Sequence, residues 1–281
     1  MRINNNITAL NTFNKYTSNT QAASKAMEKL SSGLRINRAA DDAAGLSISE
    51  KMRSQIAGLD QSNRNVEDGI SYIQTAEGAL EEVSDMLVRM KELSVEASNG
   101  TYSSEDRTNI KAEIDQLTNA ISEVSTTTKF NGIDVFGAAT TIAYGADAGQ
   151  SVTVAAASDF KALLTAGTYD HDATGSAYAL NGLAVDTYDN AKAAVGRIDD
   201  AIGTVNAQRA TYGAQQNKLS HIANNLSTTN ENISAAESNI RDVDMASEMS
   251  EYTKNNILVQ ASTSMLAQAN AMPQNVLSLL Q

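Results

Sequence analysis

Apolar residues recur every seven positions over two long stretches of this 281-residue sequence, and that spacing limits the fold more than any other feature. A heptad repeat places its residues along one narrow stripe of a helix, which suits packing against partner helices. We therefore expect a mainly α-helical protein, built as an elongated antiparallel helical bundle or coiled coil. The two rows comprise Met52, Leu59, Val66, Ile73, Leu80 and Leu87, and then Ile198, Val205, Tyr212, Leu219, Leu226, Ile233 and Ile240.

Between these rows, a shorter apolar pattern predicts a third helix. Asn99 and Gly100 end the first long helix, because Gly just after the last periodic residue is a common stop signal. Ser103 or Ser104 then caps the next helix, and the acidic residues behind it suit a helix N-terminus. The apolar row of this helix, with steps of four and three, is Ile110, Ile114, Leu117, Ile121 and Val124.

A change of character at about residues 130 to 190 predicts a small β-containing insertion between the helices. Asn131 and Gly132 supply a turn signal. Residues 140–144 and 151–154 have the composition of short strands on either side of a turn-rich segment.

The acidic composition excludes several classes of function. The chain carries 33 acidic and 21 basic side chains, a net charge of −12, which argues against binding to nucleic acid or to an anionic membrane surface. It has no Cys, so disulfides, thiol catalysis and Cys-bound zinc are excluded. No run of about 18 apolar residues predicts membrane insertion. The polar start MRINNN does not open a secretory signal, so these rules alone predict the cytoplasm.

The two chain ends predict a pair of terminal helices that must be buried against other protein. Residues 255–281 include no charged side chain, yet apolar residues continue at heptad spacing. Such a helix is poorly suited to face water on every remaining side, and its Gln and Asn residues make it too polar for a bilayer. We expect burial against other copies of the chain as well as within it. The predicted assembly residues are Ile3, Ile7, Leu10, Leu30, Leu34, Met245, Tyr252, Val259, Leu266, Val276 and Leu280.

Several motifs near both ends resemble those of bacterial flagellins. The N-terminal ones are LSSGLRIN at 30–37, DDAAGL at 41–46 and SEKMR at 49–53. The C-terminal ones are IRDVDMA at 240–246, MLAQAN at 265–270 and VLSLL at 276–280. The resemblance covers about residues 1–137 and 191–281 in the family's order, so the sequence is similar to a short flagellin with a minimal central region.

The resemblance implies a domain organisation. Residues 1–42 and 245–281 would form the terminal helical domain of the filament core. Residues 43–137 and 191–244 would form an outer helical bundle, and 138–190 a short variable insertion that contains the β-structure.

The resemblance also implies a function. The chain would be a structural subunit that self-assembles into the flagellar filament for motility, with no enzymatic activity and no cofactor. It implies an extracellular location reached by export without a cleaved signal peptide, which replaces the cytoplasmic expectation. Implied partners besides the chain itself are a flagellin export chaperone, the flagellar export apparatus, and the hook-junction and filament-cap proteins.

A further stretch resembles the flagellin segment bound by the vertebrate Toll-like receptor that senses flagellin. The residues that match this segment are Leu87, Arg89, Glu92, Leu93, Asn99 and Glu113. Lys91 stands where many family members have Arg, and Lys cannot reproduce a bidentate Arg contact. The resemblance implies that the unassembled subunit is a ligand of this receptor.

The sequence gives weaker support for a metal site or for catalysis. His171, between two acids, and His221 are expected to be ordinary surface histidines, since a metal site needs three or four converging ligands. The acid pairs at 41–42 and 199–200 are explained by helix capping and solvated faces rather than by acid–base catalysis. No His-Glu-x-x-His motif occurs. The alternative to a filament subunit is a secreted coiled-coil adhesin or effector that does not polymerise, and such a protein has no need of uncharged ends.

Overall fold

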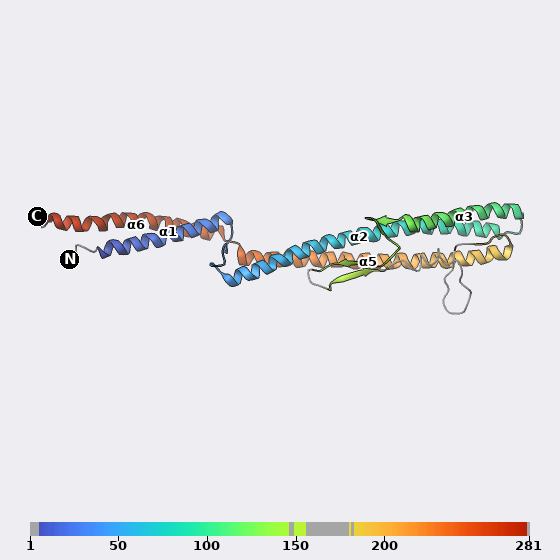
Figure 1. Cartoon of the computed structure of the whole chain (residues 1–281), viewed down its shortest axis with the longest axis horizontal. Helices are drawn as coiled ribbons and strands as arrows, with labels where there is room; N and C mark the ends of the chain where they lie inside the picture. Colours follow the sequence, from blue (N-terminus) through green and yellow to red (C-terminus); the bar gives the residue numbers. More distant parts are fainter. Residues whose placement is uncertain (1–5, 146–148, 156–179, 181–182, 280–281) are drawn as a thin grey trace. The chain divides into compact units, whose positions relative to one another are not determined.

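The computed structural model describes residues 6–145, 149–155, 180 and 183–279, with the side chains of 273–279 left out. It divides into two compact units, residues 1–56 with 231–281, and residues 57–230. The helices and strands confirm the predicted mainly α fold with a small β-containing insertion and paired terminal helices (Figure 1). The helix boundaries at Ala43 and Met245 coincide with the predicted domain boundaries, whereas the compact units divide elsewhere, so the domain assignment stays a prediction.

The first unit contains α1 (Ile7–Ser32) and α6 (Met245–Leu279), together with the start of α2 (Ala43–Ala97) and the end of α5 (Tyr188–Arg241). Gly33 ends α1 with a φ of 73°, in the left-handed conformation that glycine adopts without strain. The two segments that follow α1 and α5 then pair. The amide of Arg35 donates to the carbonyl of Arg241 at 2.6 Å, and the amide of Val243 donates to that of Gly33 at 3.0 Å.

The acid pair at 41–42 caps the start of α2, as predicted. The Oδ1 atom of Asp42 accepts from the amide of Gly45 at 2.8 Å, which satisfies a backbone donor that the first turn leaves free. The Oδ2 atom of Asp41 accepts from the amide of Arg38 at 3.0 Å. That hydrogen bond lowers the pKa of the Asp41 carboxyl.

The second unit is a bundle of α2, α3 (Ser104–Thr127) and α5, and its core is built from the predicted heptad rows. Ser103 is the N-cap of α3, in a capping box with Asp106. Antiparallel pairing of α2 and α5 is marked by the ion pairs of Lys91 with Asp199 at 2.6 Å and of Arg209 with Glu77 at 4.0 Å. The core residues with 0% exposure include Val66, Ile73, Leu80 and Leu87 on α2, Ile114 and Ile121 on α3, and Ile198, Val205, Tyr212 and Leu219 on α5.

Two antiparallel hairpins form the β-structure of the second unit; the second joins the two predicted strands, and the first forms where only a turn was predicted. The first pairs β1 (Lys129–Phe130) with β2 (Ile133–Asp134), and Asn131 and Gly132 turn the chain with φ values of 49° and 81°. Positive φ at both central residues is the condition for the tight turn that Asn-Gly favours. The second hairpin pairs β3 (Thr140–Ala143) with β4 (Ser151–Val154).

The second hairpin packs on α2 at Gly69, a glycine in the middle of the long helix. A Cβ atom at Gly69 would lie 2.3 Å from Cδ1 of Ile142 and 3.2 Å from two further carbons of the same side chain. Ile142 is itself buried, at 8% exposure. Gly69 therefore lowers the local helix propensity in exchange for close approach of β3. Nearby, the hydroxyl of Tyr72 donates to the carbonyl of Val135 at 3.1 Å.

Two glycine substitutions on α2 should have opposite effects on stability. Gly78 is exposed, and a Cβ atom added there would have no neighbouring atom within 4 Å. Gly78→Ala should therefore raise the free energy of unfolding by up to ~1 kcal/mol, because Ala has the higher helix propensity. Gly69→Ala should lower it by ~1–2 kcal/mol, because the added methyl group overpacks against Ile142. Urea unfolding of both variants measures the difference. Equal stabilisation by the two substitutions would contradict the packing.

Ionisation of Tyr212 should reduce the stability of the fold at alkaline pH. Burial in the core raises the pKa of the Tyr212 phenol to about 12, an effect that the polar side chain of Gln208 partly opposes. The folded-state pKa lies above the ordinary value of 10, so the stabilisation is complete below about pH 10 and is lost as the pH rises towards 12. The loss should approach roughly 2–3 kcal/mol.

Urea unfolding at pH 9 and pH 11.5 measures this slope. Tyr212→Phe should flatten it, whereas Tyr188→Phe, at a side chain that is 53% exposed, should leave it unchanged. An unchanged slope in the Tyr212 variant would show that other groups carry the alkaline unfolding.

Candidate functional site

Large apolar side chains are distributed in opposite ways in the two units. Among the described residues, 15 large hydrophobic side chains are exposed, and 11 of them lie in the first unit. Of the 32 buried hydrophobic residues, only Ala26, Ile36 and Ala269 belong to the first unit. The second unit therefore has a filled core of its own, whereas the first unit leaves its apolar surface outside.

The contact between α1 and α6 is made mainly by small and polar side chains. The Nδ2 atom of Asn6 donates to the carbonyl of Ala269 at 2.8 Å, and Nδ2 of Asn19 donates to Oγ of Ser262 at 3.1 Å. The third link is the ion pair of Lys29 with Glu248 at 3.6 Å. Residue numbers fall along α6 as they rise along α1, so the pair is antiparallel.

On α6 these contacts follow one line of the helix. Glu248, Asn255, Ser262 and Ala269 lie seven residues apart, and Asn255 and Ala269 are 7% and 5% exposed. Facing them on α1, Ala26 is 2% exposed. Cα atoms of the two helices come within 8 Å of each other, a close approach that small side chains permit. We call this line of contacts the polar seam.

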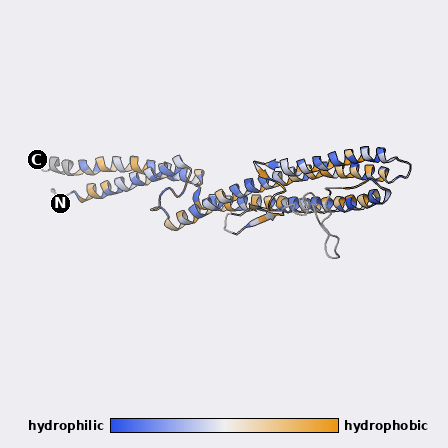
Figure 2. Ribbon diagram, turned by 45° about the vertical axis from the view of Figure 1, so that its right-hand side comes forward, coloured by the Kyte–Doolittle hydropathy of each residue, from blue (hydrophilic) through white to orange (hydrophobic). Residues whose placement is uncertain are grey.

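The exposed large apolar side chains of both helices lie outside the polar seam. Figure 2 shows hydrophobic segments recurring along α1 and α6. On α6, Leu258, Met265 and Met272 form a further heptad line that is 39%, 61% and 52% exposed. We define the assembly surface as the exposed apolar residues of the two helices, namely Ile7, Leu10, Phe13, Met27, Met245, Met249, Ile257, Leu258, Met265 and Met272.

Two open hollows interrupt the assembly surface. One has a volume of about 300 Å³ and lies between the helices, lined on the α6 side by Leu258 and Met265 and on the α1 side by Asn11, Thr12 and Lys15. The other, of about 450 Å³, is on α6 itself and includes Met249 and Ile257. Their linings combine apolar side chains with hydroxyls and one lysine each, Lys15 in the first and Lys254 in the second, a mixture that suits a protein surface.

The predicted assembly residues fall into three groups. Ile7, Leu10 and Met245 are exposed, at 59%, 59% and 48%. Ile3 and Leu280 lie outside the described residues, as does the side chain of Val276. The half-buried group beside the polar seam comprises Leu30, Leu34, Tyr252, Val259 and Leu266.

The line of Leu258, Met265 and Met272 was missed by the sequence analysis. The signal was present, because Leu258 and Met265 each precede a residue of the predicted heptad row, Val259 and Leu266. Two adjacent apolar lines on one helix indicate more apolar surface than a single partner helix covers.

The residues predicted to meet an immune receptor lie near the α2–α3 turn of the second unit. Arg89 bridges the two helices, with Nη2 3.0 Å from Oε1 of Glu113 and Nη1 3.1 Å from Oε2 of Glu92. These hydrogen bonds, first those to Glu113, raise the pKa of Arg89 above its ordinary value. All three side chains are about half exposed, and Asn99 is exposed beyond the end of α2.

Leu87 and Leu93 do not contribute to that surface. They are 0% and 2% exposed; Leu87 belongs to the heptad core of the second unit, and Leu93 is buried outside the predicted rows. Their side chains therefore support the exposed residues from beneath and offer no contact area to a partner of the folded subunit.

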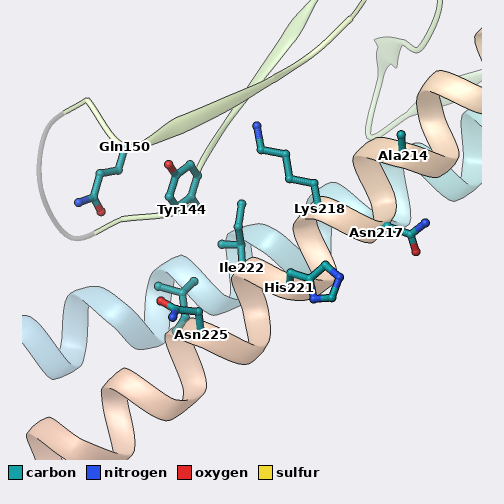
Figure 3. Close-up of a pocket in the computed structure, with 9 residues that line it drawn as sticks. Tyr144, Gln150, Ala214, Asn217, Lys218, His221, Ile222 and Asn225 are labelled. Atoms are coloured by element: carbon teal, nitrogen blue, oxygen red, sulfur yellow. The ribbon is translucent and has the colours of Figure 1, made fainter.

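A groove of about 800 Å³ lies between the second hairpin and α5 in the second unit (Figure 3). Lys218 and His221 from α5 line it, and Tyr144 lines it from the hairpin side. The lining contains no carboxylate, so it offers neither a general base of that kind nor an anionic ligand for a hard cation. His221 is exposed, in agreement with the surface role expected from the sequence.

The described residues include neither a cluster of metal ligands nor a membrane-crossing helix. No group of three or more His, Cys, Asp or Glu side chains is placed there to hold a metal ion. His171 lies outside the described part of the chain. Within that described part, no helix is both long and apolar enough to cross a bilayer.

Comparison with known proteins gives a consistent assignment over both ends of the chain. The model of the bacterial flagellin N-terminal helical region matches residues 3–141, and that of the bacterial flagellin C-terminal helical region matches residues 195–280. The chain is 49% identical to the flagellin of Bacillus subtilis (strain 168) and 45% identical to the flagellar filament 33 kDa core protein of Treponema phagedenis. Both alignments cover all of each chain.

A solved structure of a protein described as flagellar hook-associated, from Vibrio parahaemolyticus, shares the fold. Its TM-score is 0.57 at 13% identity, over 72% of this chain and 100% of that one.

The polar seam predicts weak local stability for α1 and α6 in the unassembled chain. Because mainly small side chains are buried between them, their amide hydrogens should exchange faster with solvent than those of α3 and of the parts of α2 and α5 in the second unit. Hydrogen–deuterium exchange followed by mass spectrometry measures this. Protection of α1 equal to that of α3 would contradict the weak seam.

Proposed function

Because the chain belongs to the bacterial flagellin family and is a structural subunit of the flagellar filament, we propose that its copies join through the assembly surface of α1 and α6. The observation that carries this proposal is the exposure of large apolar residues on a helix pair whose own contact is polar and small. An uncharged stretch over 255–281 adds to it, since no charge there must be desolvated when a neighbour covers the helix.

The gain from covering this surface is large enough to hold a polymer together. Full burial of such a side chain is worth ~1.5–3 kcal/mol, and these side chains are already about half covered. Ten of them would then contribute on the order of 10 kcal/mol per subunit as an upper bound, part of which offsets the entropy of association.

The domain assignment follows from the same reasoning. We assign residues 1–42 and 245–281 to the filament core, residues 43–137 and 191–244 to the outer bundle, and 138–190 to a short variable insertion. The second unit, with its filled core, suits the outer position because it is stable without neighbours. A non-polymerising adhesin or effector is disfavoured, because exposed apolar helices would serve no purpose in it.

Further partners follow from the exposed surface. Before assembly, α6 needs cover against aggregation, which suits a flagellin export chaperone that binds this helix ahead of the export apparatus. Hook-junction and filament-cap proteins would meet the same helices at the two ends of the polymer. We also propose that export takes place without cleavage of a signal peptide, which N-terminal sequencing of filament protein would test.

For the immune receptor, the exposed residues Arg89, Glu92, Asn99 and Glu113 are the proposed contacts. Arg89 is held in place by two glutamates, so its guanidinium is pre-oriented on the surface. The buried Leu87 and Leu93 are left out of the proposed contact set.

Charge placed on the assembly surface should block polymerisation without unfolding the chain. In Leu258→Glu with Met265→Glu, both positions are at least 39% exposed, so far-UV circular dichroism and melting should barely change. Burial of two carboxylates between subunits is costly, so filaments should be lost in seeded assembly viewed by electron microscopy.

Tyr188→Glu on the second unit, 53% exposed, is the matched control and should still polymerise. Deletion of residues 274–281 should also prevent filaments or leave fragile ones while the bundle melts normally. Normal filaments from the charged double variant would refute the proposed surface.

Removal of the exposed arginine should weaken receptor binding by the unassembled subunit. Arg89→Ala should reduce affinity more than tenfold, as expected for a central charged anchor. Arg53→Ala is the matched control, because Arg53 also pairs with a glutamate three residues away, at 3.1 Å, and is equally exposed. Surface plasmon resonance with the receptor ectodomain measures both. Equal affinities of the two variants would remove Arg89 from the receptor site and leave the filament function intact.

A further inference from the structure

Among the described methionines, five of the six in the first unit are exposed, Met52 being half-buried, whereas neither of the two in the second unit is exposed. Met27, Met245, Met249, Met265 and Met272 of the first unit are 48–61% exposed. In the second unit Met90 is 0% exposed and Met86 is half-buried. Because the chain has no Cys, the methionine thioethers are its oxidisable sulfur atoms.

The exposed thioethers lie within the assembly surface. Met265 lines the hollow between α1 and α6, and Met249 lines the hollow on α6. Met265 and Met272 also belong to the exposed heptad line with Leu258. A change in the polarity of these side chains therefore acts on the contact that holds the polymer together.

We propose that the five exposed methionines of the first unit are a site of reversible oxidation that makes the unassembled subunit incompetent for polymerisation. The oxidant is a two-electron oxygen donor, hydrogen peroxide or hypochlorous acid. With peroxide, a sulfur lone pair attacks one peroxide oxygen, the O–O bond breaks, and the departing hydroxide takes up a proton to give water. Sulfur loses two electrons and becomes a sulfoxide, and peroxide oxygen gains them.

The sulfoxide opposes assembly for a simple reason. Its S=O group is a strong hydrogen-bond acceptor, and its burial between subunits without a donor is unfavourable. Folding of the subunit is spared, because the modified side chains face solvent and the buried Met90 is shielded. In the polymer, the same side chains are covered by neighbours, so oxidation acts on free subunits and on newly exposed ends. This inference rests on the proposed assembly function.

Graded hydrogen peroxide treatment of the full-length unassembled chain tests the inference. Peptide mass spectrometry should find sulfoxide at the five exposed methionines at least tenfold faster than at Met90. The oxidised protein should keep its melting curve and lose seeded polymerisation. Treatment with methionine sulfoxide reductases of both stereospecificities should restore filaments.

A variant with all five residues changed to Leu is the control. It should polymerise with or without peroxide, since Leu preserves the apolar volume and has no sulfur. Normal filaments from wild-type protein with the five sites oxidised would overturn the inference while leaving the assembly function standing. Loss of assembly in the peroxide-treated Leu variant would overturn it too, because the damage would then lie elsewhere. Failure of untreated wild-type protein to polymerise would instead overturn the assembly function itself, and the inference with it.

Discussion

The polar seam between α1 and α6 is the constraint on which the properties of the first unit depend. Small side chains such as Ala26, Ser262 and Ala269 let the two backbones approach closely, but they bury little apolar surface. Asn19 and the pair of Lys29 with Glu248 fix one antiparallel register, since each needs its partner. The pair is therefore specified in geometry more strongly than it is stabilised, and its large apolar residues remain available to other chains.

The second unit has the same heptad spacing but with the opposite result. Val66, Ile73 and Leu80 on α2 are fully buried, as are Val205, Tyr212 and Leu219 on α5, so these rows are covered within the second unit. The difference lies in residue size on the contact line and not in periodicity, because both units repeat every seven residues. A heptad pattern thus indicates a helix contact. It does not indicate whether that contact buries all the apolar surface within one subunit or leaves some of it exposed.

This distinction explains how much was predictable from the sequence. The helices of the second unit and both hairpins were predictable, because buried heptads and an Asn-Gly turn are local signals. On α6 the predicted row, which includes Val259 and Leu266, is only half-buried, because the choice of the line that faces α1 depends on side chains of the partner helix. The burial of Leu93 and the close packing of Ile142 on Gly69 could not be predicted from the sequence for the same reason. Each depends on an element that is distant in the sequence.

Burial of the heptad residues decreases along the long helices, which shows that two helices alone leave part of the apolar stripe uncovered. On α5 the row runs from Leu219 at 0% exposure through Leu226 at 7% to Ile233 and Ile240, which are only half-buried. The second unit adds α3 and the two hairpins to α2 and α5, whereas the described part of the first unit has only the bridge between Leu34 and Asp242 besides its helices and connecting loop. An apolar stripe wider than one contact line needs more than one neighbour to cover it. In the assembly that we propose, other subunits of the filament are the further neighbours that cover α1 and α6.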